Sequence, residues 1–130
     1  MPTREAISTD AAPAAAGPYS QAIRAGDFVF TAGQLGLDPA SGEFVGDDVG
    51  AQAEAALGHL GAILEAAGSG LDQLVKVTVF LADIGDWPAV NEVYSRLVPE
   101  PFPARSAFAV RDLPKGARVE IEAVATVRAG

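Results

Sequence analysis

A single arginine within an apolar, strand-like run is the residue of this sequence that most directly suggests chemistry. The run extends from Phe102 to Val110 and contains Arg105. A guanidinium group is charged at every accessible pH, so burial of this run in a sheet would require a carboxylate or a phosphate beside it. That partner can come from the protein or from a bound ligand.

Two glutamates in the last strand-like segment, Glu120 and Glu122, are candidate partners for Arg105. On one interpretation they form a cross-strand or interface salt bridge with it. On the other, the rigid fork of the arginine holds a small carboxylate through two parallel hydrogen bonds, and a nearby glutamate positions or deprotonates water. The residue pattern leaves both interpretations open. Further polar groups emerge at loop or helix positions, where packing and surface roles are their ordinary alternative: Tyr19, Gln34 and Asn91.

Other common kinds of catalytic site lack the residues they need. The sequence has no cysteine, which excludes disulfides, thiolate catalysis and cysteine-ligated metals. Its one histidine, His59, cannot build a multi-histidine zinc site, and we expect it to be a partly exposed side chain of a helix. Neither a Gly-x-Ser-x-Gly elbow nor a Walker A pattern is present. We therefore expect no metal ion and no cofactor.

The composition is that of an acidic globular protein, and we expect one domain spanning residues 1–130. The formal net charge is −8 at pH 7 and the basic residues are mostly scattered, which argues against nucleic-acid binding. No apolar run reaches the roughly 18 residues that span a bilayer. The N-terminus lacks the apolar core of a signal peptide. We expect no membrane partner and a cytoplasmic location.

Hydrophobic periodicity and chain-breaking residues predict several strands. The segments 22–25 and 28–32 flank Gly26-Asp27, which is typical of a β-hairpin with a tight turn. The three prolines between positions 99 and 103 forbid helix before the run that contains Arg105. Further strands are expected at 74–82, 102–110 and 119–127.

Two amphipathic helices are predicted between these strands. The first is expected over 48–67, with Asp47 or Asp48 as its N-cap and Gly68 as its stop. The second is expected to begin at a cap on Asp86. Its buried stripe would consist of Val90, Val93, Tyr94 and Leu97.

The order of these elements predicts an α+β fold in which two helices pack on one face of a mixed β-sheet. The strand at 74–82 carries apolar residues on both of its faces. One face holds Val75, Val77, Val79 and Leu81, and the other holds Phe80. Because two helices cover only one face of the sheet, we expect the other face to meet another copy of the protein.

Several motifs occur together along the chain. They are Gly17-Pro18-Tyr19-Ser20-Gln21-Ala22, Ala32-Gly33-Gln34, Glu65-Ala66-Ala67-Gly68, Val75-Lys76-Val77-Thr78-Val79-Phe80-Leu81, Val90-Asn91-Glu92-Val93-Tyr94, Pro103-Ala104-Arg105-Ser106 and Val119-Glu120-Ile121-Glu122-Ala123. In this order and over nearly the whole chain, they resemble the RidA (YjgF-like) family of enamine/imine deaminases. The combination is specific, although each motif alone would be weak.

The resemblance implies a chorismate-mutase-like fold assembled as a homotrimer, with an active-site cleft at each subunit interface. It implies hydrolysis of 2-imino acids to 2-keto acids and ammonia without a cofactor. By resemblance, Arg105 would bind the substrate carboxylate and Glu120 would orient or activate the attacking water. Tyr19 and Asn91 would line the pocket, and the backbone of Gly33 would approach the ligand.

The sequence departs from the family pattern at two positions of the implied pocket. Ala32 stands where archetypal members have a serine, and Ala107 where a cysteine is common. The connection from Asn91 to Arg105 is also shorter than in archetypal members. A non-catalytic trimer that binds small carboxylates or a partner protein is therefore an alternative. Ribonuclease activity, known in some family members, is disfavoured by the net charge.

Overall fold

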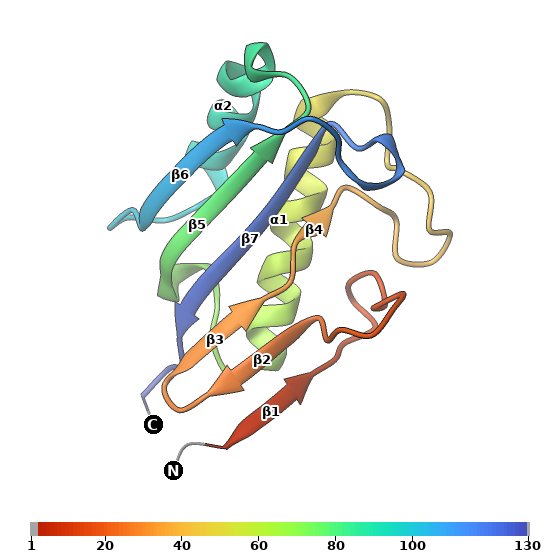
Figure 1. Ribbon diagram of the computed structural model, residues 1–130. Helices are drawn as coiled ribbons and strands as arrows, with labels where there is room; N and C mark the ends of the chain where they lie inside the picture. The colour runs from red at the N-terminus through yellow and green to blue at the C-terminus, as the bar shows by residue number, and fades with distance from the viewer. Residues whose placement is uncertain (1–2, 130) are drawn as a thin grey trace.

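A computed structural model describes residues 3–129, which form a mixed seven-stranded β-sheet and two α-helices (Figure 1). The strand order is β1-β2-β3-β7-β5-β6, and the short β4 also pairs with β7. The strands are β1 Arg4–Ile7, β2 Ala22–Ala25, β3 Phe28–Thr31, β4 Gln34–Leu35, β5 Leu74–Leu81, β6 Ala104–Ala109 and β7 Val119–Thr126. The helices are α1 Val49–Ala66 and α2 Trp87–Leu97.

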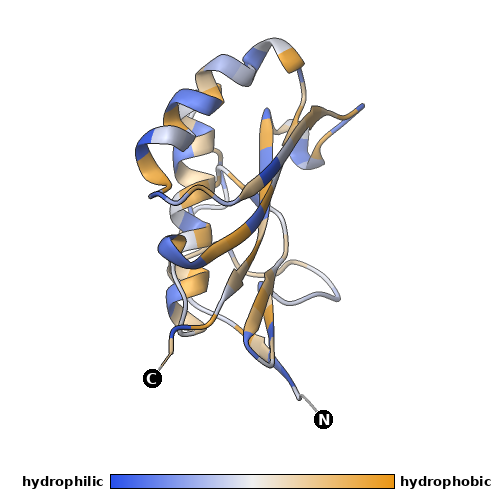
Figure 2. Ribbon diagram, turned by 90° about the vertical axis from the view of Figure 1, so that its left-hand side faces the viewer, coloured by the Kyte–Doolittle hydropathy of each residue, from blue (hydrophilic) through white to orange (hydrophobic). Residues whose placement is uncertain are grey.

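Both helices lie against the same face of the sheet, so the predicted α+β architecture is confirmed (Figures 1 and 2). Helix α1 begins at the predicted cap, where the Asp48 carboxylate accepts a hydrogen bond from the Ala51 amide at 2.9 Å. It stops before Gly68, whose φ of +81° lies in the left-handed region that favours glycine. The face of α1 that packs on the sheet is apolar and buried: Val49, Ala53, Ala56, Leu57, Leu60, Ile63 and Leu64.

Helix α2 connects β5 to β6, and this crossover makes the two strands parallel. The register pairs Val77 with Arg105 and Val79 with Ala107. Strand β6 lies at the edge of the sheet, and most of its side chains are exposed. Water therefore reaches the run that contains Arg105, and its charge needs no carboxylate from the same chain.

Strand β7 alternates as predicted and shows which residues face which side of the sheet. Val119, Ile121, Ala123 and Ala125 are buried beneath the helices. The opposite face, hereafter the open face, is covered by no element of the chain within residues 3–129 (Figure 2). Its strand residues include several exposed or half-exposed aromatic side chains: Phe28, Phe30, Phe80 and Phe108.

The prediction that His59 is partly exposed is wrong. Only 8% of this residue is accessible, because the loop after β4 folds over that side of α1. The Nε2 atom hydrogen-bonds to the carbonyl oxygen of Leu37, which can only accept, so the ring nitrogen must carry the proton. Burial lowers the pKa of His59. His59 thus fixes a loop to the helix.

Two local details also differ from the sequence-based expectation. Val75 does not share the buried face of β5, because a bulge between Leu74 and Lys76 leaves it 41% exposed. Asp86 occupies the N-cap position of α2 but makes no capping hydrogen bond. Its carboxylate instead lies 3.3 Å from the Arg118 guanidinium.

Neither helix of residues 3–129 is long and apolar enough to cross a membrane.

Candidate active site

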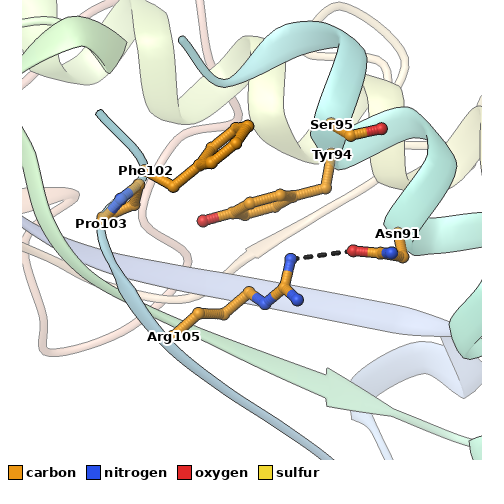
Figure 3. A pocket seen from close by; sticks show the side chains of 6 residues that line it. All are labelled: Asn91, Tyr94, Ser95, Phe102, Pro103 and Arg105. Atoms are coloured by element: carbon orange, nitrogen blue, oxygen red, sulfur yellow. Dashed lines mark hydrogen bonds between the residues drawn. The ribbon is translucent and has the colours of Figure 1, made fainter. Parts of the chain in front are cut away.

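Arg105 projects from the edge strand β6 toward helix α2. Its pairing with Val77 places it on the helix-covered face of the sheet, since paired residues of neighbouring strands point the same way. There its Nη1 donates a hydrogen bond to Asn91 Oδ1 at 2.9 Å. Figure 3 shows this bond, with Asn91 and Tyr94 both pointing from α2 toward the guanidinium group.

Two aromatic rings contact the same guanidinium. The Cζ atom of Arg105 lies 4.5 Å from the ring centroid of Trp87 and 4.6 Å from that of Tyr94. These distances are well within the range of cation–π attraction. Trp87, Asn91 and Tyr94 follow one another at helical spacing, so they share one face of α2.

Among the described residues, no carboxylate neutralises the charge of Arg105. Among residues 3–129, no carboxylate oxygen lies within 4.0 Å of its guanidinium, although six other ion pairs meet this limit. The intrachain salt bridge to Glu120 or Glu122, left open by the sequence, is therefore absent. The guanidinium instead borders a cleft of about 360 Å³. The residues that line this cleft are Asn91, Tyr94, Ser95, Phe102, Pro103 and Arg105.

The Tyr94 hydroxyl is buried beside this cleft without a hydrogen-bond partner among the described residues. Burial raises its pKa, while the positive charge of Arg105 opposes that shift. The hydroxyl therefore stays protonated at neutral pH. The Tyr94 hydroxyl makes no hydrogen bond within residues 3–129, but the Tyr94 ring packs in the core and contacts Arg105.

Glu120 lies on the other side of the sheet. It pairs with Phe80 across β5 and β7, which places it on the open face. Its side chain rests against the backbone of Gly33, where a Cβ atom would lie only 2.8 Å from Glu120 Cδ. Burial, and secondly the negative charge of Glu122, raise the pKa of Glu120. A carboxylate with a raised pKa is a better proton acceptor near neutral pH than an ordinary glutamate.

Tyr19 and Gly33 border a second cavity, of about 380 Å³, whose wall also includes Lys115. The loop that carries Tyr19 is fastened by buried Gln21, whose amide nitrogen donates to Pro13 O at 2.8 Å. Gln21 also accepts a hydrogen bond at its backbone oxygen from the Ala32 amide, at 2.9 Å. Gln21 thus links the loop that carries Tyr19 to Ala32, which precedes Gly33.

The predicted site residues consequently form two groups within one chain. Arg105 and Asn91 are in contact on the helix-covered face, and Ala107 lies on that face two residues farther along β6. Tyr19 and Gly33 border one cavity, and Gly33 lies against Glu120, which is on the open face. Within one chain, Arg105 and Glu120 therefore point to opposite faces of the sheet.

Sequence reasoning missed the aromatic contacts of Arg105. The sequence predicts Tyr94 only as part of the buried stripe, and it assigns no role to Trp87. The spacing of Trp87, Asn91 and Tyr94 on one helical face was the available signal. It carried no information about Arg105 until the parallel pairing of β5 and β6 was known.

Comparison with known proteins identifies the family. Residues 9–127 match the family model described as endoribonuclease L-PSP. The chain belongs to this family. Human 2-iminobutanoate/2-iminopropanoate deaminase is 50% identical over 122 residues, which cover 94% of this chain and 89% of that protein. The resemblance to the RidA family is therefore confirmed.

Solved structures of this family share the fold of the chain. RidA from the Antarctic bacterium Psychrobacter sp. superimposes with a TM-score of 0.91 at 46% identity, covering 95% of this chain and 99% of that one. The YjgF gene product of E. coli gives a TM-score of 0.91 at 42% identity, with coverage of 95% and 99%. The YjgF-like fold implied by the motifs is thus confirmed.

Proposed function

We propose that this RidA-family protein is a cofactor-independent hydrolase that deaminates 2-imino and enamino acids to 2-keto acids and ammonia. The observation that carries the proposal is the Arg105 guanidinium, which α2 orients at a cleft and which no carboxylate within residues 3–129 neutralises. Such a group suits the carboxylate that every 2-imino acid carries. The deaminase names of relatives at about 50% identity support the same activity.

The chemistry requires little more than placement of water. A protonated imine is already electrophilic at C2, so a water oxygen can form a bond there while Glu120 accepts its proton. Transfer of that proton to the nitrogen makes ammonia the leaving group. The C2–N bond then breaks as the C2 hydroxyl gives its proton to the Glu120 carboxylate, which forms the C=O bond of the 2-keto acid and releases ammonia. Arg105 holds the carboxylate throughout, and the raised pKa of Glu120 suits a base that must also return its proton.

A homotrimer with its active sites between subunits would reunite the two groups of site residues. The Arg105 cleft opens beside an edge strand, and Glu120 lies on an open face with exposed aromatic side chains. Packing the edge of one copy against the open face of the next would bring a carboxylate-binding group to a water-activating group. It would also remove the exposed aromatic surface from water.

Replacing Phe108 by aspartate is expected to break this assembly. Phe108 is 45% exposed on the open face and stacks edge-to-face on Phe80. A charge there would oppose burial in an interface while leaving the helix-side core intact. Light scattering after size-exclusion chromatography should show a fall from trimer to monomer mass, with loss of activity. The matched control is Ile84→Asp, which changes a similarly exposed apolar residue outside the sheet.

The deaminase activity can be tested with imines generated in place by an L-amino-acid oxidase. The purified protein should accelerate the appearance of keto acid and ammonia over the spontaneous hydrolysis rate. A rate equal to the protein-free control would contradict the proposal. Saturable binding of 2-oxobutanoate without turnover would instead favour the non-catalytic alternative that Ala32 raised.

Replacing Gly33 by alanine is expected to disable the Glu120 group while the fold persists. The new Cβ would overlap the Glu120 side chain, which must swing away from its position on the Gly33 backbone. Misplacement of a catalytic group by about 1 Å can lower a rate by about 100-fold. We expect a drop of that order in kcat, measured in the coupled imine assay. Gly46→Ala is the control, because a Cβ added at Gly46 would meet no atom of residues 3–129 within 4 Å.

A ribonuclease role is suggested only by the description of the matching family model. The net charge of −8 opposes the approach of a phosphate backbone. Two carboxylates, Glu120 and Glu122, also lie side by side on the open face. We therefore propose no nucleic-acid partner and expect RNA to stay intact during prolonged incubation with the protein. A cytoplasmic location and the absence of a membrane partner stay predictions.

A further inference from the structure

We infer that Trp87 and Tyr94 are positioning residues that act through Arg105. Their rings hold the guanidinium group in the orientation that binds the substrate carboxylate. The identity of the ligand rests on the proposed function. The contact itself rests on the geometry of α2 and β6, and it assigns to these two aromatic residues a task in addition to core packing.

The geometry separates the two ways in which a guanidinium can be held. Aromatic rings attract the cation without hydrogen bonding, and both rings have their centroids within 4.6 Å of Cζ. The N–H groups lie in the guanidinium plane, and Asn91 accepts one of them at 2.9 Å. The neutral acceptor and the two rings orient the group without neutralising it. The other N–H groups stay available for a carboxylate.

The position of Arg105 explains why its side chain needs neighbours that order it. It is exposed on an edge strand, where a long side chain would otherwise sample many rotamers. Ordering the side chain only when a ligand arrives would weaken binding, whereas ordering it beforehand avoids that loss. The two rings, unlike the Arg105 side chain, are held in place by packing in the core. Tyr94 is buried in the core, and the half-buried Trp87 packs against the same core.

The alternative is that both rings merely fill space between α2 and the sheet. Substitutions that keep or remove the ring distinguish the two roles. Trp87→Phe and Tyr94→Phe keep an aromatic face, whereas Trp87→Leu and Tyr94→Leu keep an apolar side chain without one. If the rings act on the guanidinium, only the leucine variants should weaken carboxylate binding. If the rings only fill space, carboxylate binding should not depend on whether the side chain at position 87 or 94 is aromatic.

The experiment measures binding of 2-oxobutanoate by calorimetry for these variants and the wild-type protein. Trp87→Leu and Tyr94→Leu are each expected to raise Kd by about three- to thirtyfold, and Trp87→Phe and Tyr94→Phe by less than about threefold. In the imine assay the leucine variants should raise KM with a smaller change in kcat, because the carboxylate is held in both the ground and transition states. Wild-type affinity in both leucine variants would overturn the inference. So would Tyr94→Phe weakening binding as much as Tyr94→Leu.

A second measurement needs no substitution in the core. The Nε–H signal of Arg105 in a ¹⁵N-edited NMR spectrum, assigned by its loss in Arg105→Lys, should be displaced by the ring currents of Trp87 and Tyr94. A signal at the position of the exposed Arg111 would overturn the inference. Ring-dependent binding of 2-oxobutanoate by a protein that hydrolyses no imine would refute the proposed function while leaving this inference standing.

Discussion

Arg105→Ala is expected to lower kcat/KM for 2-imino acids by roughly two to four orders of magnitude. The substitution removes two charge-assisted hydrogen bonds to the substrate carboxylate, each worth about 1.5–3 kcal/mol. Residues 3–129 offer no replacement cation at the cleft, because its other lining residues are uncharged. The measurement is the steady-state rate with imines supplied by an amino-acid oxidase, alongside the affinity for 2-oxobutanoate.

The fold should tolerate this change, so lost activity can be read as lost binding. Arg105 is exposed and forms no ion pair within residues 3–129, so its removal affects only its contacts with Trp87, Tyr94 and Asn91. We expect the free energy of unfolding to fall by about 1–3 kcal/mol, from two cation–π contacts and one hydrogen bond, which is less than the total stability of a typical domain. Arg111→Ala is the matched control, since it removes the same charge from a side chain that is 97% exposed. Undiminished turnover in Arg105→Ala would refute the role of Arg105 and the proposal built on it.

The part of this site that could be predicted from sequence is the part encoded by local pattern. The alternation of Val119 to Val127 fixed which residues of β7 share a face, and the helical stripe fixed the buried side of α1. Asp48 and Gly68 marked the ends of that helix because capping and left-handed geometry depend on adjacent residues. These features need no knowledge of distant parts of the chain.

The relation between Arg105 and Glu120 could not be obtained in this way. Whether two residues on different strands share a face depends on the register of each pairing, and a shift of one residue reverses the answer. Here the register pairs Arg105 with Val77 but Glu120 with Phe80, which point to opposite faces of β5. The burial of His59 was missed for a related reason, because it depends on a loop that returns from 22 residues away.

Glu120→Gln is expected to have opposite effects on activity and stability. Glutamine keeps the shape of the side chain but cannot accept a proton from water, so kcat should fall by about 10²–10⁴-fold. The same change removes a carboxylate that is half-buried and lies near Glu122. At neutral pH the variant should therefore unfold at a higher temperature than the wild-type protein. Calorimetric melting and the coupled imine assay measure the two effects on the same samples.

The pH dependence follows from the direction of the pKa shift. Burial first, and then Glu122, raise the pKa of Glu120 in the folded protein above its value in the unfolded chain. The stability associated with this group is therefore fully present below the unfolded-state pKa and is lost as the pH rises through the folded-state pKa. The stability gain of Glu120→Gln should appear at neutral pH and vanish at acidic pH, where Glu120 is protonated in both states. A gain that persists at acidic pH would contradict burial of the charge as its cause.

The activity of the wild-type protein should also follow the ionisation of Glu120. It should rise with pH over the range in which the stability falls. A base must be ionised to accept a proton, so kcat/KM should fall as the pH drops through the raised pKa of Glu120. Glu122→Gln removes the second cause of that shift, and the acidic limb should then move to lower pH while activity at neutral pH persists. Burial is the larger cause, so the movement should be small. A limb unmoved by Glu122→Gln and still present in the residual activity of Glu120→Gln would show that another group titrates.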